Sequence, residues 1–146
     1  MRAKLLSAGL AGGALAALAL VASPAVAENV TFKATLNASS QVPPNSSKGT
    51  GSADATYDTV GKKLTWTVTF SGLTGNATMA HFHGPAEAGT NAGVAVPIPG
   101  TASPMAGSTT LTDAQAADLM AGKWYVNIHT ADNKGGEIRG QLVKGK

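Results

Sequence analysis

The sequence contains no cysteine among its 146 residues, and only 13% of them are charged and 5% aromatic. Without thiols, the chain can form neither a disulfide nor a cysteine-based metal or catalytic site. It also lacks a Gly-x-Ser-x-Gly elbow, and its glycine-rich segment 84–93 follows no phosphate-binding pattern. Nucleophilic hydrolysis and nucleotide binding are therefore not expected.

The first 27 residues have the features of a cleavable signal peptide. Arg2 and Lys4 precede an uncharged apolar stretch, and Ala25-Val26-Ala27 offers the small side chains that signal peptidase accepts. The stretch is interrupted by glycines and is shorter than the roughly 20 residues of a membrane span. We therefore expect cleavage after Ala27, a location that is secreted, periplasmic or extracellular, and no membrane span in the remaining chain.

Residues 28–146 are expected to form one domain with a modest core. Without Arg2 and Lys4, the formal net charge falls from +3 to about +1. The remaining chain therefore lacks the strongly basic surface that is typical of nucleic-acid binding.

Alternation of apolar and polar residues predicts that this domain consists mainly of strands. Pro97 restricts one of them to a sheet edge. The expected strands are 30–36, 51–57, 63–71, 78–83, 94–98, 108–111, 123–131 and 137–143. Their apolar faces are expected to supply the core through Phe32, Leu64, Trp66, Val68, Phe70, Val126, Ile128, Ile138 and Leu142.

One short helix is predicted between the sixth and seventh strands. Thr112 and Gln115 match a capping box at its start, and Gly122 is suited to the position after its end. Seven or eight short strands with a single helix are typical of an all-β antiparallel sandwich.

All three histidines of the chain fall in predicted strands. His81 and His83 are two residues apart, so both side chains lie on one face of their strand, and both rings can reach one ion. His129 lies on the polar face of the segment 123–131. We predict that the three imidazoles project away from the core and converge on a metal ion; a hydrogen-bonded surface pair is the alternative.

Three neutral nitrogen ligands suit copper or zinc, and the affinity order of divalent ions favours copper. Met79 precedes His81 by two residues. Its thioether is either a further ligand that favours Cu(I) or an ordinary core side chain.

Three blocks of sequence carry a family resemblance: residues 81–86 (HFHGPA), 119–130 (LMAGKWYVNIHT) and 135–142 (GGEIRGQL). In this order and spacing they resemble the CHRD domain, a family named from chordin and frequent in exported bacterial proteins. The resemblance extends from Val30 to Val143. CHRD domains are similar to copper/zinc superoxide dismutase, so it implies a Greek-key sandwich of the immunoglobulin-like kind for residues 28–146.

The likeness to the dismutase implies copper-ligand roles for His81, His83 and His129. It also places Arg139 where a dismutase keeps an anion-guiding arginine, although Arg139 is better interpreted as a strand-surface residue paired with Glu137 or Asp132. The chain lacks the dismutase's metal-bridging histidine, zinc loop and disulfide. Zinc-dependent dismutase chemistry is therefore not implied.

Two functions remain open. The first is an exported protein that binds a single copper ion through three histidines, for sequestration or a weak redox role. A non-enzymatic role is favoured; an enzyme of this kind would be a copper-dependent oxidoreductase resembling superoxide dismutase. The second is a non-catalytic module, without metal, that binds an extracellular protein.

Overall fold

The computed structural model describes residues 22–146, which contain nine strands and two short helices. The α-helix is α1 (Asp113–Met120), and a 3-10 helix, η1, spans Ala38–Ser40. The strands are β1 (Asn29–Asn37), β2 (Thr50–Asp58), β3 (Lys63–Ser71), β4 (Ala77–His83), β5 (Val94–Ile98), β6 (Met105–Thr110), β7 (Tyr125–Thr130), β8 (Ile138–Gln141) and β9 (Val143–Lys144).

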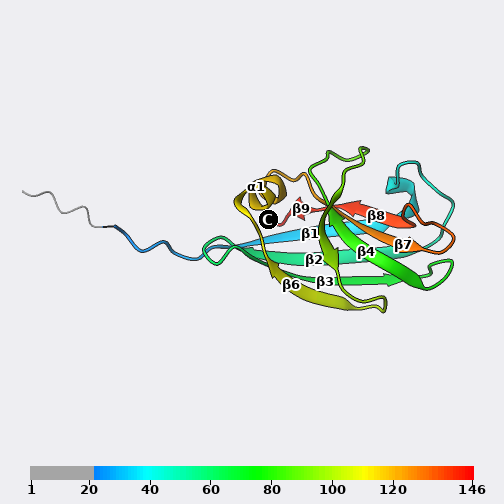
Figure 1. The fold of residues 1–146 in the computed structure, drawn as a ribbon, viewed down its shortest axis with the longest axis horizontal. Helices are drawn as coiled ribbons and strands as arrows, with labels where there is room; N and C mark the ends of the chain where they lie inside the picture. The colour runs from blue at the N-terminus through cyan, green and yellow to red at the C-terminus, as the bar shows by residue number, and fades with distance from the viewer. Residues whose placement is uncertain (1–21) are drawn as a thin grey trace, which may run out of the picture.

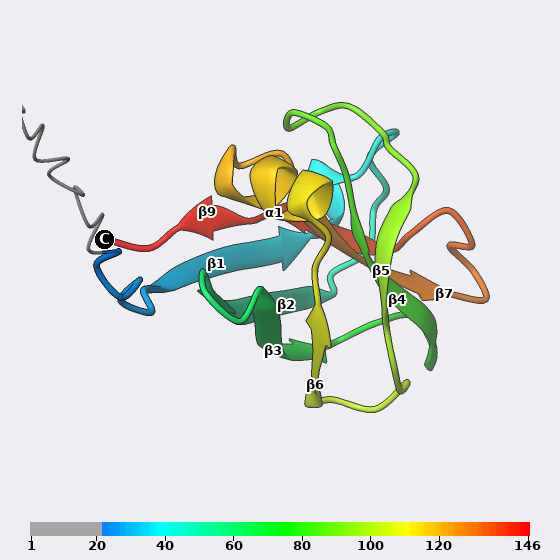
Figure 2. The same ribbon diagram turned by 60° about the vertical axis from the view of Figure 1, so that its left-hand side comes forward.

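The strands form an antiparallel sandwich that nearly closes on itself. Their order is β5-β4-β7-β8-β1-β2-β3-β6, with β9 paired to β1, and the two end strands β5 and β6 contact each other. In Figure 2, β5 runs at a steep angle to β1, with β4 beside it. The predicted all-β sandwich with one short α-helix is confirmed.

The two layers meet through their apolar faces. Trp66 of β3 packs edge-on against Phe82 of β4, with ring centroids 5.2 Å apart. Eight of the nine predicted core residues are buried. Phe70 is only partly buried because it lies near the end of β3, beyond the last residue that β6 pairs with.

Local sequence signals correctly placed most element boundaries. The capping box forms, since Thr112 Oγ1 accepts from the Gln115 amide while the Gln115 side chain accepts from the Thr112 amide. Gly122 follows the helix with a φ of 75°, in the left-handed region that glycine adopts without strain. Pro97 lies in β5, which is an end strand as predicted.

Two segments differ from the predictions. The expected loop 37–48 contains η1, whose cap is the Asn37 side chain. The expected last strand, 137–143, is divided into β8 and β9, because the Leu142 amide between them donates to the Trp124 carbonyl instead of a neighbouring strand.

The predicted signal peptide falls largely on residues 1–21, which lie outside the described part of the chain. Residues 22–28 form neither helix nor strand and are exposed. No helix among residues 22–146 has the length and apolar character needed to cross a membrane.

A buried carboxylate joins the loops at one end of the sandwich. Glu137 is fully buried and accepts hydrogen bonds from the hydroxyls of Ser47, Thr74 and Thr130 and from the Thr74 amide. Burial alone would raise the pKa of Glu137, but these hydrogen bonds outweigh it and lower the pKa from 4.5 to about 2. The ionised carboxylate therefore stabilises the folded state.

We predict that Trp66→Ala destabilises the protein by about 3 to 5 kcal/mol, because the indole is 3% exposed and its loss leaves a cavity between the layers. Urea unfolding followed by circular dichroism measures the change. Val60→Ala, at an exposed position, is the control and should stay within about 0.5 kcal/mol of the parent. Equal small losses in both variants would contradict the assigned core.

We also predict an acid-sensitive contribution from Glu137. Because folding lowers its pKa, the stabilisation is complete above pH 4.5 and is lost as the pH falls towards 2, with a size of roughly 3 kcal/mol. Urea midpoints measured between pH 6 and pH 2 should fall less steeply for Glu137→Gln than for the parent. Glu87→Gln, at an exposed carboxylate, is the matched control. A parallel decline in parent and Glu137→Gln would refute the assignment.

Candidate metal centre

The three histidines come together through the pairing of β4 with β7. In this antiparallel pair Met79 lies opposite His129, His81 opposite Asn127 and His83 opposite Tyr125. Directly opposed residues share a face of the sheet, so all three imidazoles are on the same side. Figure 1 shows the two strands side by side near the front of the molecule.

The imidazole nitrogens form a compact group. One ring nitrogen from each histidine lies within 4.8 Å of the others, and His81 Nδ1 is 3.2 Å from His129 Nε2. Two nitrogens bound to one ion at about 2.0 Å are separated by roughly 3.3 to 3.5 Å. The group therefore fits a single metal ion after a closure of at most about 1.5 Å at its widest separation.

The histidines lie outside the apolar core, as predicted, but they are more buried than a bare sheet face would allow. His83 and His129 are 8% and 6% exposed, and His81 is half-buried. Backbone groups of the 84–93 loop and of the 131–136 turn reach the rings of His83 and His129. The sequence did not predict that loops cover these two rings outside the core.

Backbone carbonyls orient two of the rings. His83 Nδ1 is 3.0 Å from the Ala92 carbonyl oxygen, and His129 Nδ1 is 2.8 Å from that of Lys134. A carbonyl only accepts, so each Nδ1 carries the proton and each Nε2 keeps its lone pair. Such a second hydrogen bond is typical of metal-binding histidines.

One ring nitrogen has no protein partner. His83 Nε2 is buried and makes no hydrogen bond to any residue in the range 22–146. A buried acceptor without a donor is destabilising unless something else satisfies it. Because His83 belongs to the three-histidine group, this free nitrogen is consistent with a metal ligand.

His81 and His83 are biased towards the neutral form that a metal needs. Burial lowers the pKa of His81 below 6.5, and the neighbouring His129 and His83 lower it further. Burial is also the main cause that lowers the pKa of His83, although its hydrogen bond to Ala92 opposes the shift. Both pKa shifts therefore favour the neutral imidazole at pH 7.

An aromatic and a cationic side chain, Tyr125 and Arg139, form a packed layer next to His83. The Tyr125 ring stacks on His83, with centroids 4.9 Å apart and planes 3° from parallel. Arg139 lies over the Tyr125 ring, with its guanidinium carbon 3.5 Å from the centroid. This layer was not predicted, because stacking depends on which residues the sheet places side by side.

Arg139 is not the surface residue that was expected. It is 2% exposed and forms no ion pair with Glu137, with Asp132 or with any other acidic residue in the described chain. Glu137 bonds to hydroxyls and an amide instead. The prediction failed because the 84–93 loop covers β8 and supplies neutral acceptors.

Met79 is not a core side chain either, since it is 49% exposed. Its position opposite His129 places it on the histidine face, at the rim of the group. The core interpretation of Met79 is therefore wrong.

Sequence reasoning also missed the polar support of β7. Asn127 accepts from Gln41 and donates to the Gly135 carbonyl. A Cβ at Gly136 would lie 2.1 Å from Asn127 Oδ1, and Gly136 has a φ of 122°, so this position requires glycine. In the sequence, the Gly135-Gly136 pair is the feature that could have indicated this close approach to β7.

Fold and site together define an antiparallel β-sandwich protein with a three-histidine group that is suited to hold a metal ion. The CHRD domain family matches residues 32–142, and the chain belongs to this family. Neither the curated proteins nor the solved structures contain a match.

We predict that the metal-free protein loses stability as the pH falls below 6.5. The pKa values of His81 and His83 are lower in the folded than in the unfolded state, so protons bind the unfolded chain more tightly in this range. Urea midpoints of chelating-resin-treated protein should therefore decline between pH 7 and pH 5. His81→Gln should reduce the decline, and a midpoint that rises on acidification would contradict the prediction.

Proposed function

We propose that this CHRD-domain protein is exported and binds a single copper ion through His81, His83 and His129, in a sequestering role. The observation that carries the proposal is the convergence of one nitrogen from each of three imidazoles within 4.8 Å, together with a buried His83 Nε2 that has no hydrogen-bond partner among residues 22–146. The signal-peptide pattern of residues 1–27 supports export.

Each histidine has a distinct part in the proposed site. His83 and His129 offer Nε2 from rings that are already oriented by backbone carbonyls, which reduces the entropy lost on binding. His81 offers Nδ1, which faces His129. The His81 proton moves to its Nε2 when the metal binds, because a ligating nitrogen needs its lone pair.

The chemistry of the ligands favours copper. Imidazole is a ligand for copper and zinc alike, and for divalent ions in one site copper binds more tightly than zinc. Bound copper supplies a metal centre that can change its oxidation state, which the weak redox alternative would use. Sequestration is the simpler role, because it requires only that the three imidazoles hold the ion.

We predict that Cu(II) at about 100 times its dissociation constant stabilises the protein by roughly 2.7 kcal/mol, because the ion binds the folded state alone. Native mass spectrometry should show one copper per chain. Thermal unfolding measures the stabilisation, and Zn(II) under the same conditions should give a smaller shift. Acidification to pH 5 should abolish the effect, since protons compete for the imidazoles.

Variants identify the ligands. His81→Ala is the most informative, because His81 is the least buried of the three and its loss should least affect the fold. Copper binding should weaken severely in His81→Ala, His83→Gln and His129→Gln, whereas Thr78→Ala, at an exposed position on the same strand, should bind like the parent. Unchanged binding in all three histidine variants would refute the site and leave the metal-free interaction module as the better function.

A further inference from the structure

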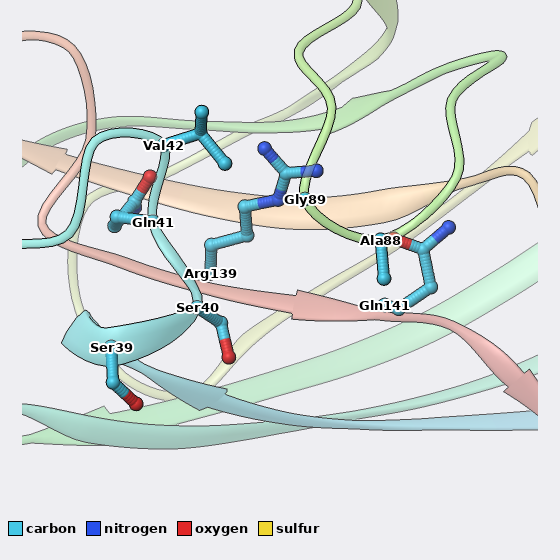
Figure 3. Close-up of a pocket in the computed structure, with 8 residues that line it drawn as sticks. All are labelled: Ser39, Ser40, Gln41, Val42, Ala88, Gly89, Arg139 and Gln141. Carbon is cyan, nitrogen blue, oxygen red and sulfur yellow. The ribbon is translucent and has the colours of Figure 1, made fainter.

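A pocket of about 400 Å³ is lined by Arg139, the residue that lies over the Tyr125 ring. Its floor is β8, and its walls are the η1 region and the 84–93 loop. Figure 3 shows Arg139 and Gln141 rising from β8 between Ser40 on one side and Ala88 and Gly89 on the other. None of these residues belongs to the histidine group.

Arg139 brings a buried positive charge to this pocket. Its Nη1 donates to Asn91 Oδ1 at 2.9 Å and its Nη2 to the Thr90 carbonyl at 2.6 Å. Both acceptors are neutral, and the third contact is the face of Tyr125. A guanidinium that is 2% exposed and lacks a carboxylate partner within residues 22–146 is costly to bury, and an anion would relieve this cost.

Gln141 lines the same pocket, and the acceptor of its side chain has no hydrogen-bond partner among residues 22–146. Its Nε2 donates to the carbonyls of Ala86 and Gly122, each at 2.9 Å, which fixes the orientation of the amide. Its Oε1 is buried and receives no hydrogen bond from the described chain. Arg139 and Gln141 are two residues apart on β8, so both side chains lie on one face of the strand.

Arg139 and Gln141 would bind different chemical groups of one ligand. Arg139 requires an anionic oxygen, and a planar guanidinium matches a carboxylate particularly well. Gln141 Oε1 requires a donor such as a hydroxyl, because a second anionic oxygen would be repelled there. The Ser40 hydroxyl at the pocket wall can bond further hydroxyls.

We propose that this pocket binds a small hydroxylated carboxylate of the size of a sugar acid. Arg139 takes the carboxylate and Gln141 Oε1 accepts a hydrogen bond from a hydroxyl. The pocket volume accommodates a molecule of this size. The proposal does not rest on copper, because no pocket residue belongs to the histidine group.

The proposal is tested by following the amide signals in nitrogen–proton correlation spectra as each ligand is added. The protein is first treated with a chelating resin to remove metal ions. D-glucuronate carries both groups, D-glucose lacks the carboxylate, and acetate lacks the hydroxyls. We expect saturable shifts of the Ser40, Gly89 and Gln141 amides with D-glucuronate, and at least about tenfold weaker binding of D-glucose and acetate. Inorganic phosphate should also bind at least about tenfold more weakly than D-glucuronate. It cannot offer an anionic oxygen to Arg139 and a separate neutral hydroxyl to Gln141 Oε1.

Two variants and a control complete the test. Arg139→Gln should weaken D-glucuronate binding about tenfold or more. Ala88→Trp should obstruct the pocket from an exposed position, without altering Arg139. Lys33→Gln removes an exposed positive charge elsewhere and should bind D-glucuronate like the parent.

The proposal is overturned if D-glucuronate gives no saturable shifts, or if acetate or phosphate binds as tightly. It is also overturned if Ala88→Trp, with an otherwise unchanged spectrum, binds like the parent. Arg139 would then be a structural link between β8 and the 84–93 loop.

Discussion

The register between β4 and β7 is the constraint on which the histidine group depends. It places His81 and His83 on the same face as His129, and it places Tyr125 beside His83. Because side chains alternate along a strand, a shift of one residue would turn this polar set into the sandwich interior. Apolar residues on the opposite face, Phe82, Val126 and Ile128, hold the register because they are fully buried.

The loops supply hydrogen-bond partners that the strands around the histidine group lack. All six residues of β7 are buried, so its polar face needs hydrogen-bond partners that the sheet does not supply. The loops provide them as backbone carbonyls for His83 and His129 and as the Gln41 side chain for Asn127. The same need explains why the loops around the site are closely tied to the sandwich in a chain without disulfides.

Tyr125 connects the two sites. One face of its ring stacks on His83, the guanidinium of Arg139 lies over the ring, and its hydroxyl bonds to the Ala92 backbone beside the His83 contact. A change at Arg139 can therefore reach His83 through a single packed ring. The stack also keeps Arg139 close enough to disfavour a positive charge on His83, which adds to the effect of burial on its pKa.

Short-range patterns determined most of the fold. Alternation in segments such as 63–71, the capping box at Thr112 and the edge position of Pro97 depend on neighbours within a few residues, so the sequence alone predicted them. The same alternation predicted that the three histidines share one side. Only the tertiary structure decided that His83 and Arg139 are buried and that both contact the Tyr125 ring. It also decided that Gln141 Oε1 has no donor among residues 22–146. These features arise where loops distant in sequence fold over β7 and β8, and the position of such loops depends on long-range packing that no local pattern encodes.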